Sequence, residues 1–476
     1  MRRVIAAAAA LLLAAGLLPA PAQAHGLVGR ADLPIPDWLF TWGAVAVLLV
    51  SFVVLAVAWR QPRLQDDTWR PLPAGLSRLL TSRGVEIAAG LIGVAALGLV
   101  VYAGLFGIDV PTANIAPTFV YVAFWLGLVP VSVFFGDVFR LLNPWRAIGR
   151  AAGWLFTRAS SGTAAPLRYP ARLGYWPAVG GLLAFGWLEL VSPTGDQPVT
   201  VAIATLIYST LTFSAMALFG VEKWCEKGET FSVYFGLFAR LSPWERRPQG
   251  LGLRRPLAGL ARWPGGSGSV ALLAAMIGIV SFDGLSAGQP FNDAIGGPLT
   301  WLRDDLGLEP SPALQAIFGA GLVLMTVAAG TFYRLGISGT PAGSGGRSHR
   351  QLAHAFVHSL VPIALAYVCA HYFSLLIFQG QALGYLASDP LGTGANLLGT
   401  ADAGIDYALV GAEALWYLQV AFVVVGHVVA LVLAHDRALA LFGDARAALR
   451  SQYPLLVIMV GYTTLALWLL AQAREG

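Results

Sequence analysis

Runs of twenty or more apolar residues recur along this chain, and they constrain its fold more than any other feature of the sequence. A helix rises about 1.5 Å per residue, so about 20 residues are needed to cross a hydrocarbon layer roughly 30 Å thick. The runs lack the alternating pattern of a barrel strand, and an irregular segment facing lipid would leave its backbone N–H and C=O groups unpaired. The runs therefore predict transmembrane helices.

Composition excludes a water-soluble protein of this length. Of the 476 residues, 57% are hydrophobic and only 12% are charged, which leaves too little polar surface to cover a soluble core. The net charge of +5 reflects topology in a membrane protein, and no basic patch indicates a nucleic-acid partner. We expect the lipid bilayer to be the main partner of the chain.

We predict an all-α fold, a polytopic transmembrane helical bundle of about ten spans that follows a cleavable signal peptide. Residues 1–24 have the basic start, apolar centre and small-residue end of a secretory signal, with cleavage after Ala24. Residues 25–476 then form a single transmembrane domain. The predicted spans are 38–59, 84–106, 117–139, 171–191, 198–220, 267–287, 313–333, 351–378, 412–435 and 453–473.

The distribution of Lys and Arg predicts the orientation of these spans. Nearly all the cationic residues fall in alternate loops, which the positive-inside rule places in the cytoplasm: 60–83, 140–170, 221–266, 334–350 and 436–452. The mature N-terminus and the C-terminus are then outside. Within the longest of these loops, the apolar segment 229–241 is too short to span and forms either an interfacial helix or a re-entrant segment.

Histidines inside two spans are the first candidates for function, because ionisable side chains are costly inside a bilayer. The eighth span carries His354 and His358 one turn apart, and Pro362 has no N–H to donate to the carbonyl of His358. The ninth span carries His427 and His435 eight residues apart, roughly on one helix face. Counted from the membrane surfaces, His358 and His427 fall at similar depth. The four histidines and one carboxylate near the inner end of the third span form the predicted inner group: His354, His358, His427, His435 and Asp137.

Imidazoles and carboxylates at one level suit two kinds of chemistry. They are ligands for zinc, copper or iron, and they also form histidine–carboxylate proton paths. His358 and His427 are the first ligands to consider for a divalent metal, whereas His354 and His435 are most simply solvated at the interface. The sequence HAFVH lacks the glutamate of a zincin helix, so the metalloprotease hypothesis fails.

A second polar group lies toward the predicted outer surface. It draws on the fourth, sixth, eighth and ninth spans and consists of Glu189, Asp283, His371 and Glu413. Side chains of this kind suit the lining of a pathway mouth.

Three stretches of the sequence carry a likeness to a known family. They are AHGLVGRADLPIPDWLF at 24–40, SDPLGTGANLLGTAD at 388–402 and GHVVALVLAHDRALALFG at 426–443. With them the mature chain resembles the bacterial multi-pass membrane proteins of the fenitrothion hydrolase-like family. The resemblance implies hydrolysis of an aryl phosphotriester, a lipophilic small molecule that partitions into a membrane, and it implies the bacterial cytoplasmic membrane as the location. It supplies no catalytic residues.

Two hypotheses for function follow. As a hydrolase of a lipophilic organophosphate triester or related ester, the protein would activate water, a task that a histidine-bound metal performs. As a secondary transporter or channel-like protein, it would use the same residues as a proton or cation relay between helices. The family resemblance favours hydrolysis, and the architecture favours transport.

Overall fold

The computed structural model describes residues 37–159, 165–340 and 346–472, in which helices dominate and three short strands form one small sheet. The all-α prediction is confirmed. The predicted signal peptide, residues 1–24, lies outside the described residues.

Seven helical segments are long and apolar enough to cross a membrane, which supports a membrane protein in contact with lipid. Three of them are assembled from consecutive helices: α3 (Ala74–Leu80) with α4 (Arg83–Phe106); α5 (Ile115–Thr118), η2 (Phe119–Leu126) and α6 (Leu128–Phe135); and α17 (His349–Phe356), η4 (Val357–Leu360) and α18 (Val361–Ser388). The other four are single helices: α10 (Pro198–Phe219), α14 (Ser269–Ser286), α16 (Pro310–Ser338) and α19 (Ala412–Phe442).

Helices also lie at the three other predicted spans: α2 (Asp37–Ala58), α9 (Trp176–Leu190) and α20 (Ala445–Gln472). The α9 helix has 15 residues, and this length covers about 22 Å, which is less than the hydrocarbon layer. The count of ten spans therefore stays a prediction.

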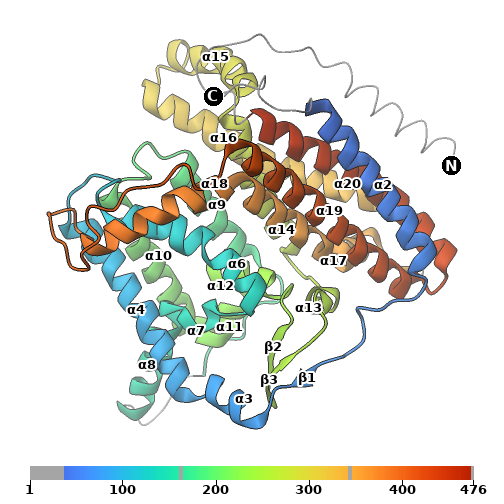
Figure 1. Ribbon diagram of the computed structural model, residues 1–476, viewed down its shortest axis with the longest axis horizontal. Coiled ribbons are helices and arrows are strands. Elements are labelled where there is room, and N and C mark those ends of the chain that lie inside the picture. The colour runs from blue at the N-terminus through green and yellow to red at the C-terminus, as the bar shows by residue number, and fades with distance from the viewer. Residues whose placement is uncertain (1–36, 160–164, 341–345, 473–476) are drawn as a thin grey trace.

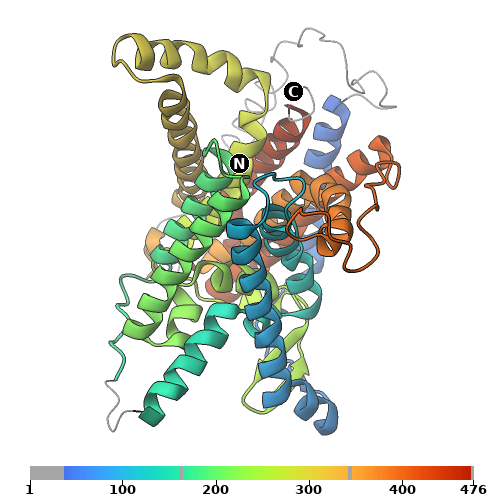
Figure 2. The same ribbon diagram turned by 90° about the vertical axis from the view of Figure 1, so that its left-hand side faces the viewer.

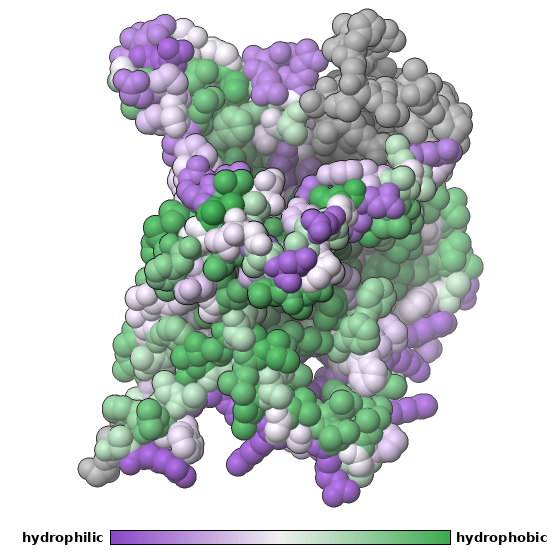
Figure 3. All heavy atoms as spheres, turned by 60° about the vertical axis from the view of Figure 1, so that its left-hand side comes forward, coloured by the Kyte–Doolittle hydropathy of each residue, from purple (hydrophilic) through white to green (hydrophobic). Residues whose placement is uncertain are grey.

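The α14 helix forms the centre of the bundle, since 78% of its apolar window is buried inside the protein. Large apolar side chains on the surrounding helices instead point outward, for example Val53 on α2, Leu91 on α4 and Leu324 on α16. Figure 3 shows hydrophobic residues over the middle of one face and hydrophilic residues gathered toward its two ends. So much exposed apolar surface is stable only against lipid.

Amphipathic and polar elements lie at the two ends of the bundle. The helix α15 (Gln289–Asp304) lies at one end in Figures 1 and 2. At the opposite end are α3, α8 (Pro144–Ala159), which follows α7 (Phe139–Leu142), and the small sheet. The end that holds α8 and the sheet carries segments predicted to be cytoplasmic.

The segment 221–266, expected as a connecting loop, is folded throughout most of its length. It contains α11 (Val221–Lys227), α12 (Thr230–Ala239), β2 (Trp244–Arg247), β3 (Gly250–Leu253) and α13 (Ala258–Ala261). Eight of the ten residues of α12 are buried, and α12 packs against α6 and α9, so it is enclosed by the bundle instead of lying at an interface. An enclosed short helix needs its first N–H groups satisfied by protein, and the buried carboxylate of Glu229 accepts those of Phe231 (3.0 Å) and Ser232 (2.8 Å).

The sheet joins two segments predicted to be cytoplasmic. Its strand order is β1 (Arg70–Pro71), β3, β2, all antiparallel. Asp67 accepts two hydrogen bonds from Arg247 (2.5 and 2.8 Å) and one from Arg262 (3.0 Å), so the carboxylate ties the linker after α2 to the β2–β3 hairpin.

Replacing Asp67 should loosen this hairpin. Arg247 lowers the pKa of Asp67 from 3.8 to about 2, so the ionised carboxylate stabilises the sheet above its ordinary pKa and this contribution is lost as the pH falls through about 2. At neutral pH we expect Asp67→Asn to increase amide hydrogen exchange in residues 244–253, measured by mass spectrometry. The neighbouring exposed Asp66, changed to Asn, is the matched control, and equal exchange in the two variants would contradict this role.

Candidate functional site

The hydrogen-bonded pair of Asp283 and His371 lies between two helices of the bundle. Asp283 is near the end of α14, His371 is in the middle of α18, and these helices pack together. The Nε2 atom of His371 lies 2.9 Å from Oδ2 of Asp283, and both side chains are mostly buried, with exposed fractions of 20% and 23%. The sequence predicted these two residues as members of the outer group, and the structure brings them into contact.

A second carboxyl group lies near this pair. Glu189, near the end of α9, has its Oε2 atom buried and without a protein hydrogen-bond partner, and the charge of Asp283 acts on it. An unsatisfied buried polar atom costs about 1–3 kcal/mol. The carboxyl of Glu189 is therefore stable only if it carries a proton or binds water.

Two tyrosines complete the surroundings of Glu189. Tyr234 on α12 and Tyr372 on α18 are buried, and Glu189 acts electrostatically on both. The hydroxyl of Tyr372 lies beside Asp283, yet neither tyrosine hydroxyl makes a hydrogen bond of ordinary geometry. We call this set the outer polar site: Glu189, Tyr234, Asp283, His371 and Tyr372.

Sequence reasoning missed both tyrosines. Tyr372 follows His371 in the middle of a span, away from the interfaces where tyrosine is common, and that position was the available signal. Tyr234 carried no such signal because its segment was expected at the membrane surface. Its ring stacks on Trp125 of η2, with ring centroids 4.3 Å apart, which holds the hydroxyl in place.

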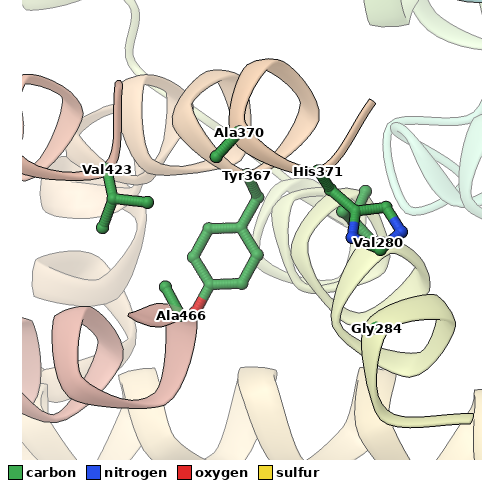
Figure 4. A pocket seen from close by; sticks show the side chains of 7 residues that line it. All are labelled: Val280, Gly284, Tyr367, Ala370, His371, Val423 and Ala466. Carbon is green, nitrogen blue, oxygen red and sulfur yellow. The ribbon is translucent and has the colours of Figure 1, made fainter. Parts of the chain in front are cut away.

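A small cavity adjoins the outer polar site (Figure 4). His371 and Tyr367 of α18 border it, together with residues of α14, α19 and α20. Its volume is about 20 Å³, enough for one ordered water molecule. The full lining is Val280, Gly284, Tyr367, Ala370, His371, Val423 and Ala466.

Glu413, the fourth residue predicted for the outer group, lies elsewhere. It is exposed in the first turn of α19. Six residues later, Gln419 donates a hydrogen bond to the carbonyl of Ala370 (2.7 Å), next to His371. Glu413 therefore lies about 9 Å farther along the helix axis than the level of His371.

The packing of α19 against α18 separates His358 from His427. Gly426 lies so close to α18 that a Cβ atom there would be 2.7 Å from the carbonyl oxygen of Pro362. His358 instead lies beside the carbonyl of Leu433, six residues beyond His427 and about 9 Å along the axis. His358 and His427 therefore do not lie at the same depth, contrary to the prediction from the sequence. The reason is that close backbone contact, and not the position of the helix ends, sets how α18 and α19 align.

Both of these histidines are fully buried, with exposed fractions of 0%. The Nδ1 atom of His427 lies 2.7 Å from the carbonyl oxygen of Val423, whereas its Nε2 atom has no protein partner. His358 has no protein hydrogen bond of ordinary geometry at either ring nitrogen. Its own carbonyl, expected to lack a donor because of Pro362, accepts the N–H of Val361 through the tighter 3₁₀ turn η4.

His435 belongs to a structural clamp at the end of α2. Its ring nitrogens lie 3.0 Å from Oε1 of Gln452 and 2.8 Å from the carbonyl oxygen of Trp59. The adjacent Asp436 is fully buried and accepts four hydrogen bonds, from Nε1 of Trp59, the N–H groups of Arg63 and Leu64, and Nε2 of Gln65. These contacts attach the linker after α2 to α19.

The other two residues of the inner group are separate from the buried histidines. His354 is half-buried in α17, and Asp137 follows α6, where it accepts the N–H of Arg140 (3.2 Å). Over residues 37–159, 165–340 and 346–472, no three His, Cys, Asp or Glu side chains gather as ligands for a metal ion. The described residues thus offer no third ligand for a metal on His358 and His427, although a zinc site requires three or four.

No protein-family model, curated protein or solved structure matches this chain. A fold alone does not imply a function, so function is inferred from the chemistry of the outer polar site and the buried histidines.

Removing the carboxylate of the clamp should destabilise the protein. Asp436→Ala leaves buried donors from the linker without an acceptor, so we expect the free energy of unfolding to fall by roughly 3 kcal/mol or more. Thermal unfolding in detergent measures the loss as a lower Tm. Asp402→Ala, in an exposed loop, is the control, and an unchanged Tm for Asp436→Ala would refute the clamp.

Proposed function

We propose that this chain is a membrane transport protein whose transport step is coupled to proton binding at the outer polar site. The observation that carries the proposal is the Asp283–His371 pair inside the bundle, with the carboxyl group of Glu189 beside it. Ionisable groups in such a place are costly and are typical of proton and ion pathways.

The three titratable groups provide the chemistry. Two carboxyl groups and one imidazole share a poorly solvated space, so they bind protons as one coupled unit. A proton that joins or leaves this unit changes its net charge by one. Inside a low-dielectric bundle, a change of one charge favours a different packing of the surrounding helices, which is the requirement for coupling proton binding to transport.

The cavity beside His371 supports proton binding over the binding of a large solute in this conformation. Its volume admits one water molecule, which connects the imidazole to further polar groups without admitting a bulky ligand. The transported solute therefore does not pass through this cavity in this conformation. It enters either in another conformation of the bundle or by a different route.

Substitution of the carboxyl groups tests the proposal. In liposomes with a pH-sensitive dye inside, we expect a negative internal potential to drive proton uptake by the wild-type protein. Asp283→Asn and Glu189→Gln should each reduce that uptake at least tenfold, because the amide cannot exchange the proton.

Asp293→Asn is the matched control, since Asp293 is an exposed carboxylate on α15. Wild-type protein that moves no protons under any imposed potential or pH gradient would refute the proposal. So would full activity in both Asp283→Asn and Glu189→Gln.

Hydrolysis is the second candidate, and the same dyad favours it. Asp283 holds His371 in a fixed orientation next to a cavity of the size of a water molecule, which is the arrangement of a general base that activates water. The resemblance to fenitrothion hydrolase-like proteins adds the substrate class, a lipophilic aryl phosphotriester that reaches the bundle from the lipid.

The release of a coloured phenolate from a lipophilic aryl phosphotriester tests hydrolysis. For a hydrolase, the detergent-purified protein should turn over, and His371→Ala should lower kcat/KM at least 100-fold because a general base contributes about 10²–10⁴. Circular dichroism checks that the variant is folded. Turnover that persists in His371→Ala would exclude this dyad as the catalytic base.

A further inference from the structure

The interface between α18 and α19 forms a polar seam through the bundle. The two helices run antiparallel, and three contacts set their register: Gln419 with Ala370, Gly426 with Pro362, and Leu433 with His358. In this register, later residues of α19 lie beside earlier residues of α18 and of η4 before it. The seam therefore begins at the outer polar site and ends near η4.

Polar side chains follow one another along this seam. The cavity connects His371 with Tyr367 and Val423, the latter two lying one turn farther toward η4 than His371. His427 comes one turn after Val423, about 6 Å along the axis, and His358 lies farther along the seam, beside the carbonyl of Leu433. A proton path along these side chains therefore needs ordered water between them, with each hydrogen bond spanning about 2.8 Å.

The buried imidazoles require such bridging partners. The Nε2 atom of His427 has no protein partner, and the buried ring of His358 has the carbonyls of Ala355 and Leu433 beside it, neither at ordinary hydrogen-bond geometry. Buried polar atoms of this kind are normally satisfied by ordered water, and a water site next to a titratable group can pass a proton.

We propose that protons move between the outer polar site and the η4 end of the bundle along the α18–α19 seam, with His427 and His358 as the intermediate acceptors. This inference rests on the proposed function, because it assigns the path by which the outer polar site exchanges protons with the opposite side. The path consists of His371, the cavity at Tyr367, His427 and His358.

The hydrogen bonds determine how each imidazole acts. Nδ1 of His427 donates to the carbonyl of Val423, so this hydrogen stays in place and Nε2 is the basic atom. Nε2 has one lone pair, so it accepts a proton from the water molecule bound there and returns that proton to the next water molecule in the same position, with no net change in the imidazole. His358 has two ring nitrogens available, so a proton binds at one and leaves from the other.

One charged side chain faces the end of the path. The guanidinium of Arg437, on α19, acts electrostatically on His358, and one of its Nη atoms donates to the carbonyl of Ala261. Its positive charge disfavours an excess proton on His358, so a proton stays on that imidazole only briefly. Among the described residues, no carboxylate acts electrostatically on His358 or His427.

Non-titratable substitutions along the seam test the path. In the liposome assay of voltage-driven proton uptake, we expect His427→Leu and His358→Leu each to lower the proton flux at least tenfold. His349→Leu is the matched control, because His349 is an exposed histidine at the start of α17. His427→Asn and His358→Asn keep a polar side chain of similar size, so they replace the leucine variants if those fail to fold, with the same expected loss.

The outcomes separate this inference from the proposed function. Proton flux that is lost in Asp283→Asn but retained in folded His427 and His358 variants would overturn the seam path and leave the outer polar site standing. Wild-type protein without proton flux would overturn both. We expect the proton flux to be lost in the His427 and His358 variants and in Asp283→Asn. We expect it to be retained in His349→Leu.

Discussion

Polar groups inside this bundle have no bulk water to bind, and this constraint explains most of its interior hydrogen bonds. The buried carboxylate of Glu229 is surrounded by donors, including Nδ2 of Asn143 at 2.9 Å and the first N–H groups of its own helix. Asp436 is satisfied in the same way by the linker after α2. These groups are structural because protein donors occupy their acceptor atoms, and they hold α12 and α2 in place.

Against that background, the exceptions are informative. His358 and His427 are enclosed just as deeply and Glu189 is partly buried, but each keeps a buried polar atom without a hydrogen bond of ordinary geometry. The proposed proton exchange uses these open positions on titratable side chains. Glu189 lies on α9, His358 on η4 and His427 on α19, so the proposed exchange would take place inside the helical bundle.

The two candidate functions use the same dyad differently. In transport, Asp283 and His371 exchange a proton that continues along the seam; in hydrolysis, Asp283 orients His371 toward a water molecule that attacks a substrate. The proposed seam path belongs to the transport candidate, because a hydrolytic dyad has no need of buried histidines two to four helical turns away. Gly426 is central to this arrangement, since its lack of a side chain allows α19 to approach the Pro362 carbonyl and sets the level of each histidine.

Hydrophobic runs and charge distribution alone determined that the chain is an all-α membrane protein, because segment length and apolarity are local properties. The sequence also identified Glu189, Asp283 and His371, since an ionisable residue within a span is visible without a structure. Only the tertiary structure decided that α12 is enclosed, that His435 and Asp436 form a clamp, and that His358 and His427 lie at different levels. These features depend on which backbone surfaces meet and in what register, and spacing within one helix carries no information about its offset from another.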